Sequence, residues 1–196
     1  MNERDKTEQR MIEVALGLFL EQGIKGTSVD AIAHAAGLTR VTIYRYFPQR
    51  EQIVQAAFRR LVAPFKKVQD WVEADPDVDI ESALDSIAHE LADLPHGDLP
   101  SRLEELQRVH PAIYQEFSRT RREALRVIFE QLFAVAKRQR RLRPGLNRAV
   151  VEAYFMEIVI NVFESPTLLA QGLPPAELYT TVKTLFLYGI LKEKEP

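Results

Sequence analysis

Apolar residues recur at the spacing of an α-helix along almost the whole of this chain. Ile12, Ala15, Leu16 and Phe19 mark a first amphipathic helix, which Gly23 ends. No segment of any length alternates apolar and polar residues in the way that is typical of a half-buried strand. The sequence therefore predicts an all-α fold, with three short helices up to about residue 47 and a larger helical bundle after them.

Capping residues and prolines divide the chain into separate helices. Ser28 is suited to cap a second helix that stops at Gly37, and Leu38 and Thr39 open a third helix that Pro48 closes. The remaining helices are expected at 50–74, with a kink or break at Pro64, and at 80–93, 101–110, 112–142, 147–163 with an extension past Pro166, and 175–192.

Composition excludes several classes of functional site. The 196 residues include no cysteine, so disulfides, thiolate catalysis and cysteine-bound zinc are ruled out. The four histidines, at 34, 89, 96 and 110, lack metal-ligand spacing, and neither a glycine-rich phosphate loop nor a nucleophile elbow is present. We therefore expect no enzyme activity, no metal and no cofactor. The first ten residues are charged and Glu157 interrupts the longest apolar run, which predicts a cytoplasmic protein.

The segment LTRVTIYRYFPQR, residues 38–50, combines a thin apolar stripe with cationic, aromatic and hydroxyl side chains. On a helix, Ile43 and Phe47 fall one turn apart and face the preceding helices, while Arg45 points the opposite way. Arginine can bond the acceptors of guanine in the major groove, and tyrosine and threonine hydroxyls can bond phosphate oxygens. The outer face of this helix is therefore suited to duplex DNA.

The local charge supports this interpretation. The chain has a net charge of −2, yet residues 23–50 hold four basic side chains against one acid, Asp30. Two helices joined by a short turn that contains glycine, the second of them with such a face, form a helix-turn-helix. A charged aromatic face on an arbitrary helix is more often simply solvated, but the slim preceding helix, the turn and the charge reversal favour DNA.

Residues 12–54 resemble the N-terminal DNA-binding domain of tetracycline-repressor (TetR) type regulators. The resemblance lies in Ala15, Phe19, Gly23, Thr27 and Ser28, in IA at 32–33, AGL at 36–38 and TIYRYF at 42–47, and in Arg50 with Glu51. The DNA contacts that it implies are Ser28 at the cap of the second helix, the readers Thr39, Arg40, Thr42, Arg45 and Tyr46 on the third, and the backbone clamps Tyr44 and Arg50.

Two positions depart from the family pattern. Arg50 stands where lysine is commoner, which keeps the charge, and Asp30 stands where many members place a basic or neutral base reader. Asp30 either stabilises the first turn of its helix or rejects some DNA sequences. The resemblance also implies a division into a DNA-binding domain, 1–50, and a ligand-binding and dimerisation domain, 51–196.

The sequence of the larger part supports a dimer. Its last two long helices are apolar nearly all round, which predicts a two-fold four-helix interface between identical chains. Candidate ligand contacts are Trp71, Phe117, Thr120, Arg121, Tyr154, Glu157 and Asn161. Alternatives stay open: Trp71 is more often a core residue, Arg121 more often pairs with a carboxylate, and the polar stripe of Tyr154, Glu157 and Asn161 suits bonds across a dimer equally well.

These features predict a ligand-responsive transcriptional regulator. It is expected to be a repressor that binds a palindromic DNA operator as a homodimer and is released by a small molecule. The alternative is a helical protein–protein interaction module that no longer binds DNA, which the overall acidity and Asp30 support. An α-helical enzyme is disfavoured, because no paired catalytic constellation is present.

Overall fold

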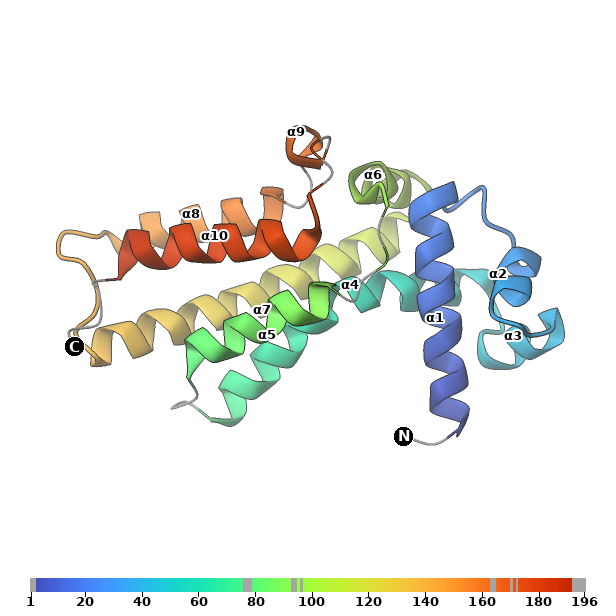
Figure 1. Cartoon of the computed structure of the whole chain (residues 1–196), viewed down its shortest axis with the longest axis horizontal. Helices are drawn as coiled ribbons and strands as arrows, with labels where there is room; N and C mark the ends of the chain where they lie inside the picture. Colours follow the sequence, from blue (N-terminus) through green and yellow to red (C-terminus); the bar gives the residue numbers. More distant parts are fainter. Residues whose placement is uncertain are drawn as a thin grey trace. The chain divides into compact units, whose positions relative to one another are not determined.

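The computed structural model of the chain describes residues 3–75, 79–92, 95, 97–162, 165–169, 171 and 173–191 (Figure 1). Its helices are α1 (Glu3–Gln22), α2 (Val29–Ala35), α3 (Arg40–Tyr46), α4 (Arg50–Ala74), α5 (Ile80–Ala92), α6 (Leu99–Val109), α7 (Pro111–Arg138), α8 (Arg148–Asn161), α9 (Pro166–Leu169) and α10 (Pro175–Ile190). Apart from one isolated antiparallel bridge between Leu142 and Leu191, all regular structure in these ranges is helical, which confirms the all-α class.

The helix boundaries in the N-terminal part follow the residues that predicted them. The Ser28 hydroxyl accepts the N–H of Ala31 at 3.0 Å and so caps α2. The Thr39 hydroxyl accepts the N–H of Thr42 at 3.2 Å and caps α3. Gly37 has a φ of 65° in the turn between them, a conformation that a residue with a Cβ rarely adopts.

The structure contradicts two expectations of a break or continuation at proline. Helix α4 continues through Pro64 without a break, with the buried Leu61 and Phe65 on either side, and the expected kink stays a prediction. Conversely, α8 does not continue past Pro166: Ser165 is not helical, and Pro166 begins the separate helix α9. The helix ends expected at residues 93, 163 and 192, and His96, lie outside the described residues.

The chain forms two compact units. The first unit comprises residues 1–63 and 94–118, and the second comprises 64–93 and 119–196. The first half of α4, all of α6 and the start of α7 belong to the first unit, and the functional division expected at residue 50 stays a prediction. No helix in the described part of the chain has the length and hydropathy that are needed to span a membrane.

Each unit has its own apolar core. In the first, Phe19 of α1 stacks on Phe58 of α4 with ring centroids 6.5 Å apart, and both rings are fully buried. In the second, α10 packs against α5 and α8. A row of rings joins Phe129, Phe155 and Phe186, with centroids 5.5 Å and 4.9 Å apart, and links α7, α8 and α10.

Candidate nucleic-acid interface

Helix α3 has one buried side and one exposed side, as its sequence predicted. Ile43 is fully buried and Phe47, which caps the helix, is nearly so. On the opposite side Arg45 is exposed and Val41 is 79% exposed. Burying Ile43 and Phe47 against the neighbouring helices fixes the rotation of α3, so the outward direction of Arg45 follows from packing.

The polar side chains of α3 are held by their neighbours. The guanidinium of Arg40 lies over the Tyr44 ring, 5.5 Å from its centroid, and that of Arg45 lies 5.9 Å from the centroid of Tyr46. Arg4 of α1 lies 5.6 Å from the same Tyr46 ring. These contacts restrict the arginine side chains while leaving them exposed, which lowers the entropy lost when they bond a partner.

Hydroxyl groups lie beside these cations at the start of α3. The Oγ1 atoms of Thr39 and Thr42 are 2.9 Å apart and share a hydrogen bond on the exposed end of the helix. Ser28 is exposed at the start of α2. Such groups can bond phosphate oxygens and fix the register of a helix on a duplex.

Asp30 is the acidic residue of this surface, and it pairs with a predicted DNA contact. Its Oδ2 accepts a hydrogen bond from Nη1 of Arg40 at 2.9 Å, and both side chains are exposed. Hydrogen bonding to Tyr44, followed by the Asp30 carboxylate, raises the pKa of Arg40 above its ordinary value. Asp30 also lies in the first turn of α2, where a negative charge is favourable.

Arg50 is engaged within the protein. Its Nη2 donates to the carbonyl oxygen of Thr27 at 3.0 Å and to that of Ile24, both in the turn between α1 and α2. The start of α4 is thereby tied to the loop that precedes α2. A phosphate contact by Arg50, as the family resemblance implies, stays a prediction and requires that at least part of this guanidinium remain available.

Sequence analysis missed a second group that holds the same turn. The carboxylate of Glu105 in α6 accepts the backbone N–H groups of Ile24 and Lys25, both at 2.9 Å, and Nη1 of Arg102 lies 3.3 Å away. Burial alone raises the pKa of Glu105, but the two backbone N–H groups and Arg102 bring it below its ordinary value. Glu105 lies 80 residues from Lys25 in sequence, so no local pattern could have revealed the contact.

The predicted ligand contacts differ widely in burial. Phe117 and Arg121 are buried and Thr120 is partly exposed, whereas Trp71 and Tyr154 are 46% and 58% exposed. Glu157 and Asn161 are exposed, and their side chains share a hydrogen bond of 2.7 Å. None of these seven is among the described side chains that line the cavity found in the second unit. Their role in ligand binding stays a prediction.

The geometry of α2 and α3 is that of a helix-turn-helix, and comparison with known proteins agrees. Residues 11–57 match the sequence profile of the family described as bacterial regulatory proteins, tetR family. The transcriptional regulator SrpR of Pseudomonas putida is 28% identical over 104 residues, 53% of this chain and 46% of that regulator, so the alignment spans about half of its length. The N-terminal part of the chain is therefore similar to the DNA-binding region of that family.

More distant comparisons extend the likeness beyond the N-terminal helices. The transcriptional repressor KstR2 of Mycobacterium tuberculosis is 26% identical over 146 residues, 74% of this chain and 67% of that repressor. The structure of SmeT, the repressor of the Stenotrophomonas maltophilia multidrug efflux pump SmeDEF, superposes with a TM-score of 0.64 at 18% identity, covering 94% of this chain and 90% of that one. This last comparison shows that the whole fold is shared.

Proposed function

We propose that the protein is a ligand-responsive transcriptional repressor that binds a near-palindromic DNA operator as a homodimer. The observation that carries this proposal is the two-sided structure of α3, which buries Ile43 and presents Arg45, within a segment that matches a family of regulators. Arg45 is suited to bond guanine in the major groove, while hydroxyls of α3 fix the position of the helix through phosphates. The names of KstR2 and SmeT as repressors support the sign of regulation.

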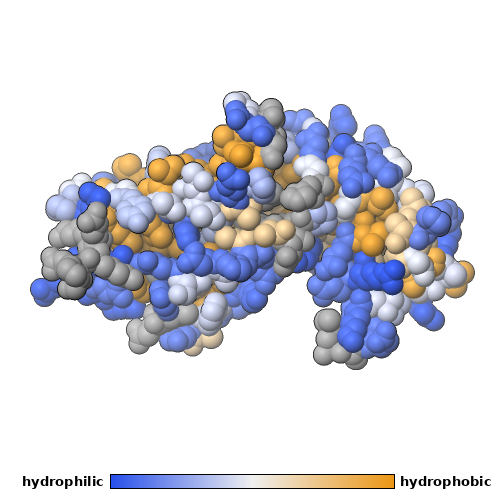
Figure 2. Space-filling model, viewed as in Figure 1, coloured by the Kyte–Doolittle hydropathy of each residue, from blue (hydrophilic) through white to orange (hydrophobic). Residues whose placement is uncertain are grey.

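A dimer is supported by the surface of the last two long helices, which lie side by side in the second unit (Figure 1). Val150 and Tyr154 of α8 and Leu185 and Tyr188 of α10 are 58–69% exposed. Hydrophobic surface is visible over α8 and α10 in Figure 2. We infer that these four residues, the α8–α10 patch, meet their equivalents in a second chain, which gives the closed two-fold contact that is usual for homodimers.

The dimer matters for DNA binding because two half-sites require two reading helices. Half-sites are one duplex turn apart, about 34–36 Å, so a change in the spacing of the two α3 helices prevents both from docking. Helix α4 contributes residues to both units, and a ligand bound in the second unit that moves α4 would change this spacing. To shift the population from 1:99 to 99:1, the ligand must distinguish the two states by about 5.5 kcal/mol.

The test begins with selection of duplexes from a random library by the purified protein. We expect an enriched inverted repeat, bound by the dimer. Tyr44→Phe and Arg45→Ala should weaken binding to that repeat while sedimentation still shows a dimer. Failure to enrich any repeat, or unchanged binding by both variants, would refute the assignment of the α3 face.

One observation favours a second function. The ion pair between Asp30 and Arg40 neutralises one of the basic groups on the candidate interface, as expected for an interaction module that no longer binds DNA. Binding to random duplex at several salt concentrations separates the two functions. Each phosphate that the protein neutralises lowers log K by about 0.9 per unit of log salt, whereas a protein–protein module shows no such slope.

A further inference from the structure

Val41 is the most exposed large apolar side chain among the residues that the structure describes. It is 79% exposed, and the other exposed side chains of this kind within those residues all lie in the second unit. A single exposed valine is ordinary on a protein surface. The position of Val41 makes it informative, because it lies on the outer side of α3 among the predicted DNA contacts and has no role among them.

Val41 shares its side of the helix with Arg45. The two residues are four positions apart in α3, so their side chains project from the same side. A helix rises about 1.5 Å per residue, which separates the two positions by about 6 Å along its axis. Base pairs of a duplex are about 3.4 Å apart, so the two side chains can meet base pairs within about three steps of each other.

The chemistry of valine limits what it can recognise in a groove. Its isopropyl group has no hydrogen-bond donor or acceptor, so it distinguishes base pairs only through apolar contact. The C5-methyl group of thymine is the apolar group that base edges present in the major groove, where the other positions carry donors and acceptors. Against those positions, a valine would remove water from polar atoms and offer them no partner.

The side chain of Val41 is ordered although it is exposed. Valine is branched at Cβ and strongly prefers one χ1 rotamer in a helix. The backbone on either side is held by the cap of α3, since Thr39 accepts the N–H of Thr42 at its hydroxyl and the N–H of Ile43 at its carbonyl oxygen, at 3.2 Å and 3.1 Å. The isopropyl group therefore loses little conformational entropy when it meets a partner.

The surroundings of Val41 favour a duplex over a partner protein. Arg45 is exposed beside it, and the hydroxyls of Thr39 and Thr42 lie on the same exposed end of the helix. These groups match the phosphates that border a groove. A single valine also offers little apolar area to a protein interface, which buries about 800 Å² on each partner.

We infer that Val41 recognises the C5-methyl group of a thymine in each half-site of the operator, within about three base pairs of the guanine that Arg45 contacts. The inference rests on the proposed function and adds to it a residue that determines specificity. It also states part of the sequence that the protein selects.

Replacement of thymine by uracil tests the inference, because it removes the methyl group and keeps every hydrogen-bonding atom of the base. The selected inverted repeat is prepared with deoxyuridine at one thymine position at a time, in both half-sites. At one position near the guanine of Arg45, we expect uracil to weaken binding of the wild-type protein about tenfold. Each of the two chains loses contact with one methyl group, which is worth about three- to fourfold.

A thymine outside the half-sites provides the DNA control, where uracil should leave the affinity within about twofold. An enriched repeat without a thymine in the stated range, or wild-type binding that is indifferent to uracil there, would overturn this inference and leave the proposed repressor standing. A protein that enriches no repeat refutes the proposed repressor, and this inference with it.

Val41→Ala assigns the effect to this side chain. Alanine has the highest helix propensity and Val41 lies outside the core, so thermal unfolding of the variant should resemble that of the wild type. The variant should bind the thymine and uracil duplexes within about twofold of each other. Thr42→Ala, a truncation of the neighbouring branched side chain, should weaken binding to both duplexes and keep the difference between them. A difference that persists in Val41→Ala, or that disappears in Thr42→Ala instead, would overturn the assignment.

Discussion

Helix α3 and the helices around the cavity differ in how far the role of each face can be predicted from sequence. In α3, apolar Ile43 and charged Arg45 lie on opposite sides of one short helix. The helical period of the sequence therefore distinguishes the packed face from the proposed binding face. In α8 and α10, apolar residues occur on all sides, and packing, cavity lining and exposed patch are made of the same residue types. The comparison shows that a functional face can be predicted from sequence when its side chains differ chemically from those of the core.

The largest effect should come from a charge placed in the α8–α10 patch. Leu185→Glu is expected to dissociate the dimer, because an uncompensated buried carboxylate costs about 3–5 kcal/mol and a two-fold contact carries it twice. Sedimentation velocity over a range of concentrations measures the change. Gln107→Glu adds a carboxylate at an exposed position of α6 and should leave the dimer intact. A dimer that survives Leu185→Glu would place the interface elsewhere.

The next largest effect concerns the turn between α1 and α2. Glu105→Ala leaves the N–H groups of Ile24 and Lys25 without their acceptor, and should destabilise the first unit by about 2–4 kcal/mol. Hydrogen exchange of amides in that unit measures it, since the single tryptophan, Trp71, lies in the second unit. Glu104→Ala removes an exposed neighbouring carboxylate and is the matched control. Equal protection in both variants would contradict the role of Glu105.

The same carboxylate predicts a dependence on pH. The pKa of Glu105 is lower in the folded chain than its ordinary value of 4.5, so its contribution to stability is present above that value and is lost as pH falls through the folded value. We expect the stability difference between the wild type and Glu105→Gln to shrink below about pH 4.5. Urea unfolding of both proteins between neutral and acid pH, followed by hydrogen exchange, measures the difference; a constant difference would contradict the prediction.

A smaller loss is expected for Arg45→Ala. Losing a forked contact with guanine should cost about 1–3 kcal/mol of operator binding and relax the preference at that base pair. Fluorescence anisotropy with the selected repeat and single-base variants measures both. Arg126→Ala, an exposed arginine of α7, is the control for charge. Loss of affinity without loss of base preference would mean that Arg45 contacts only the backbone.

The smallest effect concerns Asp30, the acidic residue of the proposed DNA-binding face. Asp30→Asn removes the carboxylate that pairs with Arg40, so the freed guanidinium should bind one more phosphate and steepen the salt slope on random duplex by about 0.9. The ratio of specific to random affinity should then fall. A slope that stays the same would show that Asp30 acts only as a first-turn acid of α2.

Much of the fold could be predicted from the sequence, because glycine, proline and capping residues mark helix ends locally. Ser28 and Thr39 cap the helices that they were expected to cap. The continuity of α4 through Pro64 could not be predicted, since it depends on packing along both halves of that helix. The same limit applies to Glu105 and to the cavity, which are assembled from helices far apart in the chain.

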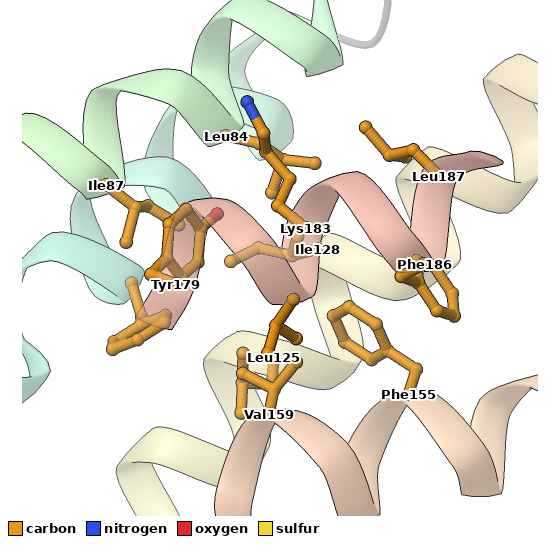
Figure 3. Close-up of a pocket in the computed structure, with 12 residues that line it drawn as sticks. Leu84, Ile87, Leu125, Ile128, Phe155, Val159, Tyr179, Lys183, Phe186 and Leu187 are labelled. Carbon is orange, nitrogen blue, oxygen red and sulfur yellow. The ribbon is translucent and has the colours of Figure 1, made fainter. Parts of the chain in front are cut away.

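The candidate ligand contacts show the limit most clearly. Tyr154 and Glu157 are predicted ligand contacts because they are polar groups on an apolar helix; both are exposed, and their role stays a prediction. The cavity of the second unit is lined by ordinary aliphatic and aromatic residues such as Leu125 and Phe186 (Figure 3), which no pattern distinguishes from core. An apolar site offers no chemical contrast from which a sequence can reveal it.

The separation of buried and exposed residues on α3 has a consequence for the evolution of the proposed repressor. Val41 and Arg45 take no part in the core, so substitutions there can alter the recognised sequence while the fold is untouched. Ile43 and Phe47 are buried, so substitutions there are expected to disturb the packing of α3, whichever DNA sequence the helix binds. On the proposed function, gene duplicates can acquire new target sites through a few outward positions, and a designer has the same positions to work with.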